Sequence, residues 1–266
     1  MTAMLGMYDL PHLQAANNRF WAAIRSCLNT GPDTLERSRD FWDIWRDPGM
    51  VFAQTCGMPY RTALHGHVHL VGTPDYGLPG CPPGYYNSVL VARADAPGDT
   101  MADFSGQRFA FNEAVSQSGW AAPATHAAKT GTVFGAYIPT GAHIASAKAV
   151  ADNNADIAAI DALTWALICE CEPWASHLRE VERTDPTPGL PYITSLANDP
   201  VHIRTAVEQA IAMLSEADRA ALRRQREADL ALALGDTVTD VHQSGELVQP
   251  LGQFPGRGFQ GRGRGM

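Results

Sequence analysis

The hydrophobic residues of this chain follow two patterns: short continuous runs, and longer segments in which they recur every three or four positions. A short continuous apolar run, such as residues 50–54, indicates a buried strand. Between such runs, apolar residues recur every three or four positions, as they do over 13–28 before Gly31-Pro32, which indicates helices that stop at glycine and proline. Strand, helix and strand follow one another over 132–161, which predicts two parallel strands joined by a crossover helix and therefore an α/β protein. We expect further strands and helices at residues 5–8, 68–72, 85–93, 165–174, 200–214 and 215–222.

Small polar residues follow three of the predicted strands, where each strand gives way to a helix. These junctions cover residues 54–57, 112–119 and 139–143. The first turn of a helix has N–H groups without partners and carries partial positive charge, so it suits an anion. In open α/β sheets, ligands bind at the carboxyl ends of strands. The three junctions therefore predict an anion-binding site.

The candidate site combines three side chains of these junctions with one at the end of the strand that follows His143: Ser116, Ser118, His143 and Asp161. The two hydroxyls and the imidazole can donate hydrogen bonds to an oxyanion. The carboxylate can accept a hydrogen bond from a protonated ligand oxygen and repels a fully ionised anion. Alternative interpretations stay open: either serine can be a helix N-cap alone, His143 can be a polar residue at a helix start, and Asp161 can be a cap.

The charge of the chain argues against nucleic acid as its partner. Its 266 residues carry a formal net charge of −8, whereas phosphate backbones attract basic surfaces. An anion would therefore be held by local dipoles and hydrogen bonds. The most apolar segment, residues 155–169, is too short for a membrane span and contains two aspartates. No secretory signal is recognisable before Tyr8.

The five cysteines are odd in number and lack zinc-type spacing. Cys169-Glu-Cys171 has one residue between its thiols, not the two of a thioredoxin-like motif. Cys56 and Cys81 lie in glycine-containing turns and could pair in an oxidising compartment. We expect no metal site and no cofactor.

Several segments, in order, resemble the phosphate, phosphite and phosphonate substrate-binding proteins of ABC importers. The resemblance covers most of residues 5–195, and the Ser-x-Ser-Gly, Gly-Ala-His and Ile-Asp pieces in this order are fairly specific as a set. The matching segments are residues 53–57, 80–88, 112–119, 141–146, 158–161 and 178–191.

The resemblance implies a type 2 periplasmic-binding-protein fold with two lobes and a ligand cleft between them. One lobe would be discontinuous, formed by residues 1–90 and 186–255, and the other would be residues 91–185. The last segment, residues 256–266, is rich in glycine and arginine and is expected to be disordered.

The resemblance also implies roles for individual residues. The Ser-x-Ser turn would hold a phosphorus oxyanion, the histidine would donate to it and the aspartate would accept a proton. Gln117 occupies a position at which relatives often carry threonine, so the resemblance selects no single oxyanion. The full set of expected ligand-binding residues is Tyr8, Gln54, Thr55, Ser116, Gln117, Ser118, His143 and Asp161.

The predicted function is non-catalytic binding of phosphonate, phosphite or phosphate with hinge closure, as the solute-binding component of an ABC importer. No nucleophile–base motif is recognisable. The alternatives are an enzyme on the same scaffold, with His143 as base and Ser116 or Ser118 as nucleophile, or a cytoplasmic anion sensor. The resemblance implies a periplasmic monomer that delivers its ligand to an ABC permease, and a cytoplasmic location is the alternative.

Overall fold

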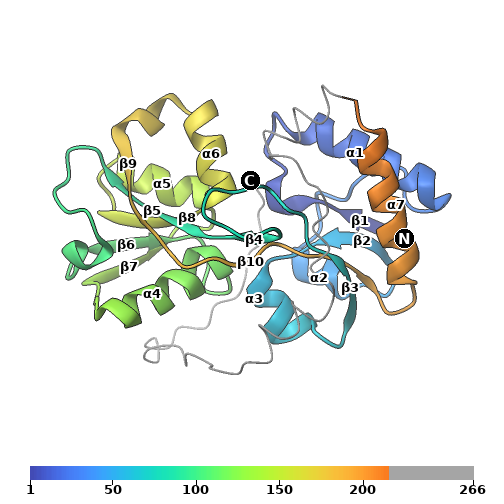
Figure 1. The fold of residues 1–266 in the computed structure, drawn as a ribbon, viewed down its shortest axis with the longest axis horizontal. Helices are drawn as coiled ribbons and strands as arrows, with labels where there is room; N and C mark the ends of the chain where they lie inside the picture. Colours follow the sequence, from blue (N-terminus) through green and yellow to red (C-terminus); the bar gives the residue numbers. More distant parts are fainter. Residues whose placement is uncertain (216–266) are drawn as a thin grey trace.

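A computed structural model of the protein describes residues 1–215 and has two α/β lobes that lie side by side (Figure 1). Each lobe is built on its own sheet, one of four strands and one of five. The predicted α/β class is therefore confirmed. The predicted helix at 215–222 and the predicted disordered tail at 256–266 lie outside the described residues, apart from Ser215.

The first lobe contains the four-stranded sheet, in the order β1-β2-β11-β3. β1 is parallel to β2, whereas β11 runs antiparallel to both of its neighbours. Helices α1 and α7 pack against each other on this lobe (Figure 1). Its strands are β1 Thr2–Met4, β2 Met50–Gln54, β3 Val68–Gly72 and β11 Tyr192–Ser195. Its helices are η1 Gly6–Tyr8, α1 Gln14–Leu28, α2 Phe41–Trp45, α3 Gly57–Pro59, η2 Tyr60–Leu64 and α7 Pro200–Met213.

The second lobe contains the five-stranded sheet, in the order β7-β6-β8-β5-β9. β6 is parallel to β7 and β8, and β5 is antiparallel to β8 and β9. Its strands are β5 Ser88–Arg93, β6 Arg108–Phe111, β7 Ala136–Pro139, β8 Ile157–Asp161 and β9 Leu178–Arg183. Its helices are η3 Met101–Phe104, η4 Gln117–Ala121, α4 Ala122–Thr130, α5 His143–Ala151, α6 Ala162–Cys171 and η5 Pro173–His177.

Two short strands run between the lobes (Figure 1). β4, Tyr85–Tyr86, and β10, Thr187–Pro188, pair antiparallel as a separate two-stranded ribbon. β4 leads into β5 of the second lobe, and β10 leads back toward β11 of the first. The lobes are thus joined by a narrow ribbon rather than by a continuous sheet.

Apolar packing continues from one lobe into the other beside this ribbon. Leu13 and Tyr76 of the first lobe belong to the same buried cluster as Ile160, Leu163 and Trp165 of the second. Each lobe also has a core of its own: Phe52 stacks on Trp21 in the first, and Phe109 stacks on Phe134 in the second. Burial of these side chains provides the main driving force for folding.

Some predicted elements shift in the structure. The strand predicted at 5–8 is wrong: β1 ends at Met4 and η1 follows. Gly6, the first residue of η1, lies close to the Phe41 ring: a Cβ there would lie 2.7 Å from Phe41 Cζ. The predicted parallel strands of 132–161 are confirmed as β7 and β8, but β6 lies between them. Within residues 1–215, none of the helices combines the length and apolar character that a membrane crossing requires.

Candidate functional site

The turn after β6 is held by an N-cap. β6 ends at Phe111, and Ser116 Oγ accepts a hydrogen bond of 3.0 Å from Gly119 N. Ser116 is therefore an N-cap, and its expected role in ligand binding stays a prediction. A Cβ at Gly119 would collide with Asn112 Oδ1, so only glycine fits this turn without displacing that side chain.

The helix that follows opens with a π-helical turn, η4, a rare conformation that often occurs at functional sites. Gln117 N donates across the lobes to Cys56 Sγ, at 3.3 Å. Cys56 precedes α3 in the first lobe, and α3 packs against η4. The amide group of the Ser-x-Ser turn thus faces the other lobe, as an anion site between lobes requires.

Ser118 and His143 meet side by side. Ser118 Oγ and His143 Nε2 are 3.0 Å apart, and His143 is the first residue of α5. Burial lowers the pKa of His143 to about 4, so the imidazole is neutral near pH 7. His143 Nδ1 is buried and has no hydrogen-bond partner of standard geometry among the described residues. Because a neutral imidazole has one N–H group and the Ser118–His143 bond uses one hydrogen, the pair can offer one hydrogen bond to a ligand without adding charge.

Asp161 ends β8 and caps α6. Its Oδ1 accepts from Thr164 N at 2.9 Å, and its Oδ2 accepts from the hydroxyl of Tyr8, in the first lobe, at 3.0 Å. Burial raises the pKa of Asp161 to about 6, although these hydrogen bonds favour the ionised form. Burial, and then the Asp161 charge, raises the pKa of Tyr8 well above its usual value, which keeps the phenol protonated. Asp161 therefore caps α6 and also connects the two lobes through its hydrogen bond with Tyr8.

Gln54 and Thr55 lie on the first-lobe side of the site and differ in their hydrogen bonding. Gln54 is buried, and its Nε2 donates to Tyr76 Oη at 2.8 Å and to the Leu190 carbonyl at 3.2 Å. The amide N–H groups of Gln54 therefore already have partners. Thr55 is fully buried and its Oγ1 has no hydrogen-bond partner among the described residues. An unpaired buried hydroxyl costs free energy unless a ligand or water pairs with it.

Sequence reasoning missed two side chains at this site, Cys56 and Tyr86. In the sequence, only the position of Cys56 directly after Gln54-Thr55 could have indicated that it lies at the site. Nothing in the spacing singled out Tyr86, which β4 brings between the lobes. Cys56 and Cys81 are free thiols, as are the other three cysteines, so the disulfide considered between them is not formed.

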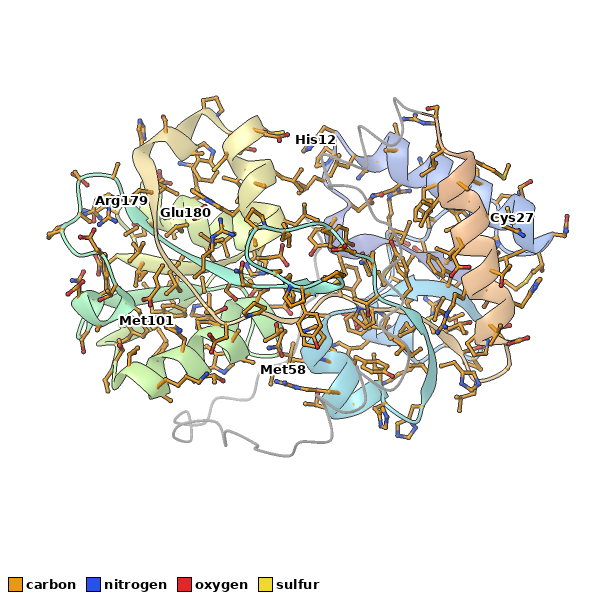
Figure 2. All side chains as sticks on the ribbon, viewed as in Figure 1. His12, Cys27, Met58, Met101, Arg179 and Glu180 are labelled. Atoms are coloured by element: carbon orange, nitrogen blue, oxygen red, sulfur yellow. The ribbon has the colours of Figure 1, made fainter. Side chains whose placement is uncertain are left out.

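The lobes touch across the site. In addition to the carboxylate–phenol bond, Cys56 of the first lobe contacts Gln117 of the second, and Cys171 Sγ lies 3.6 Å from His12 Nε2. Figure 2 shows His12 where the lobes approach each other. The structure is therefore a closed arrangement, in which Ser116, Ser118 and Asp161 are buried.

The site has one carboxylate, and the cation that interacts electrostatically with its side chains, Arg61, acts on Cys56 and Tyr86. No arginine or lysine of residues 1–215 forms a salt bridge with Asp161. The same part of the chain holds no group of three or more side chains suited to a metal ion. What the site offers is hydroxyls, an imidazole, helix N–H groups and one acceptor.

A two-lobed α/β fold with buried polar groups facing each other from both lobes defines the class of periplasmic binding proteins. A sequence model described as "ABC transporter, phosphonate, periplasmic substrate-binding protein" matches residues 52–235. The chain belongs to this family of phosphonate ABC-transporter substrate-binding proteins, whose members bind solutes and are not enzymes. A comparison with curated proteins found no match.

Several solved structures share the fold at low sequence identity. PhnD1 from Prochlorococcus marinus MIT 9301, in complex with methylphosphonate, has a TM-score of 0.74 and 14% identity, with 92% of this chain and 96% of that chain covered. A binding protein component of an ABC phosphonate transporter from Pseudomonas aeruginosa, PA3383, has a TM-score of 0.69 and 15% identity, with 91% and 83% covered. XAC2383 from Xanthomonas citri, bound to chloride ion, has a TM-score of 0.66 and 15% identity, with 91% and 95% covered.

Proposed function

We propose that this substrate-binding protein holds one small phosphorus oxyanion, a phosphonate, phosphite or phosphate, between Ser118 and Asp161. The observation that carries the proposal is the set of buried donors around a single carboxylate. Family membership and the methylphosphonate bound by PhnD1 support the ligand class. As the solute-binding component of an ABC importer, the protein would close its lobes around the ligand and open them to release it.

The second lobe would supply most of the donors. The Gln117 N–H group, the Ser118 hydroxyl and the His143 imidazole all belong to the region around η4 and α5. Ser116 Oγ accepts a bond as a cap, and its own O–H proton can still be donated to the ligand. The Gln117 and Ser116 donors, and the one hydrogen that the Ser118–His143 pair has left, would bind the ionised oxygens of the ligand.

The first lobe would complete the site when the lobes close. The Thr55 hydroxyl lacks a partner among the described residues and would pair with a ligand oxygen. Tyr8 would act with Asp161, to which it already donates. Gln54 would act indirectly, because its amide positions Tyr76 and the Leu190 carbonyl. Closure therefore brings polar groups of both lobes onto one ligand.

Asp161 would select the protonation state of the ligand. A dianion next to this carboxylate would place like charges side by side in a buried region, which is strongly unfavourable. A monoanion can donate its remaining proton to Asp161, and a protonated Asp161 can donate to an oxygen instead. The site would thus prefer ligands that share a proton with the carboxylate.

An enzyme on this scaffold is a poorer explanation of the same geometry. Ser118 and His143 lie within reach of each other, which a nucleophile–base pair needs. A carboxylate that orients the imidazole is the third part of such a site, but Asp161 bonds to Tyr8 and Thr164 instead. The pair is suited to donate a hydrogen bond to a bound anion.

The cellular setting is part of the proposal. The family is periplasmic, so we propose that the protein works in the periplasm as a monomer and delivers its ligand to an ABC permease. The narrow β4–β10 ribbon would act as the hinge for closure.

Titration calorimetry would test the ligand assignment. Purified protein is titrated with phosphate, phosphite, methylphosphonate and 2-aminoethylphosphonate, and with sulfate as the control that carries no proton near neutral pH. One-to-one binding of a phosphorus oxyanion, absent for sulfate, is the expected result. Ser118→Ala should weaken it, whereas Ser176→Ala, an exposed hydroxyl on η5, should leave it unchanged. Binding of sulfate alone, or of none of these anions, would refute the proposal.

A further inference from the structure

Cys56 occupies an unusual place for a free thiol. It follows β2 and immediately precedes α3, in the part of the first lobe that packs against η4. Its sulfur accepts the Gln117 N–H group at 3.3 Å, although the two residues belong to different lobes. No motif of the sequence assigns a role to this cysteine.

The Gln117 N–H group is one of the first-turn donors that suit an anion. A donor of this kind cannot point at the Cys56 sulfur and at a ligand oxygen with full strength at the same time. In the closed arrangement, the sulfur therefore takes the acceptor position of a ligand atom. A neutral thiol is a weak acceptor, and burial raises the pKa of Cys56, so the thiol stays protonated. A charged oxyanion is the stronger acceptor.

The buried hydroxyl of Tyr86 is a second, independent sign of a ligand position near Cys56. Tyr86 is 1% exposed, and its hydroxyl faces the side chains of Cys56 and Ser118. That hydroxyl has no hydrogen bond of standard geometry within residues 1–215. A buried phenol between these two side chains points to a ligand atom that it would bind, because buried polar groups are nearly always paired.

We propose that the Cys56 thiol is an internal stand-in for a ligand oxygen and that it must leave Gln117 N when the ligand binds. The Gln117 N–H bond to the thiol competes with a ligand oxygen for the same donor, so the thiol weakens ligand binding and sets the affinity of the site. Tyr86, whose hydroxyl has only weak contacts with Ser118 and Cys56, would then gain a stronger hydrogen-bond partner. This inference rests on the proposed function, because it takes the Ser-x-Ser turn to be the oxyanion site.

The first test compares the affinities of variants. Cys56→Ala removes the competing acceptor, and we expect the ligand to bind about fivefold more tightly, which corresponds to roughly 1 kcal/mol for one weak hydrogen bond. Cys27→Ala is the matched control, since Cys27 is also a half-buried free thiol but lies on α1, away from the approach of the lobes (Figure 2). An unchanged or weaker affinity of Cys56→Ala would refute the stand-in role.

The second test modifies the thiol. Methyl methanethiosulfonate transfers a methylthio group: the cysteine thiolate attacks its sulfur, a Cys–S–S–CH₃ disulfide forms and methanesulfinate leaves, while the thiol proton goes to water. The treated wild type should lose ligand binding and regain it with dithiothreitol. Treated Cys56→Ala still carries the other four cysteines and should keep binding. Binding by wild type whose Cys56 is shown by mass spectrometry to carry the methylthio group, or loss of binding in treated Cys56→Ala, would overturn the inference.

The two proposals fail in different ways. If the untreated wild type binds none of the phosphorus oxyanions, the proposed function is wrong. If the wild type binds one of them while Cys56→Ala and the methylthio derivative behave like the wild type, the proposed function stands and only the role of Cys56 is wrong.

Discussion

Replacing Asp161 with asparagine should stabilise the ligand-free protein at neutral and alkaline pH. The carboxyl is 2% exposed and its pKa is raised from 3.8 to about 6 by burial. Between these two values, the folded state binds more protons than the unfolded state. Stability therefore falls as the pH rises through this window, and the full penalty is present above the folded pKa. An asparagine side chain at this position would carry no charge and no such penalty.

The magnitude follows from the size of the shift. A change of one pKa unit corresponds to about 1.4 kcal/mol, so the shift of Asp161 destabilises the ligand-free protein by up to about 3 kcal/mol above the folded pKa. Asparagine can still accept from Thr164 N, but it changes the pairing with the Tyr8 hydroxyl. The net gain of Asp161→Asn should therefore be smaller than this limit.

Urea unfolding of the wild type and Asp161→Asn at several pH values would measure the effect. The difference in the free energy of unfolding should be smallest below the unfolded pKa and should grow as the pH passes the folded pKa. Asp185→Asn is the control: its carboxylate is exposed and pairs with Lys129, which lowers its pKa, so a small change of opposite sign is expected. A difference for Asp161→Asn that does not depend on pH would refute the reasoning.

Three further predictions concern the turn, the donor pair and a helix cap. Gly119→Ala places a Cβ against Asn112 Oδ1 and should lower the free energy of unfolding by about 1–3 kcal/mol; wild-type stability in urea would contradict this. Ser118→Ala removes the hydroxyl beside His143 and should weaken oxyanion binding about tenfold by calorimetry, with unchanged affinity as the contrary result. Asp199→Ala removes the cap of α7 and should lower stability by about 1 kcal/mol, yet leave the affinity for the ligand unchanged.

The sequence predicted the elements of the fold better than their arrangement. The spacing of apolar residues identified β2, β3, β8 and α1, because these elements bury continuous runs or regular faces. It could not place β11 between β2 and β3, since that pairing depends on contacts between distant parts of the chain. The family resemblance, and not periodicity, supplied the two-lobed arrangement. The proposed lobe boundaries at residues 90 and 185 stay a prediction.

The candidate site was partly visible in the sequence. Ser116, Ser118 and Asp161 follow strands of one sheet, so their proximity follows from the rule that ligands meet the carboxyl ends of strands. Cys56 and Tyr86 reach the same region from β2 and β4, and the contact of Cys56 with Gln117 exists only because two lobes close. Side chains that meet through the packing of separate lobes leave no local pattern. The ligand-binding roles of all these residues stay predictions.

The two lobes also differ in how far apart in the chain their strands lie. The five-stranded sheet is built from one uninterrupted stretch, residues 88–183, whereas the four-stranded sheet needs β11, where Thr194 Oγ1 bonds to the Val51 carbonyl across 143 positions. Pairings of large sequence separation form slowly, because long loops must close first. During refolding, we therefore expect the second lobe to form first and to shorten the distance over which β11 must find its place between β2 and β3.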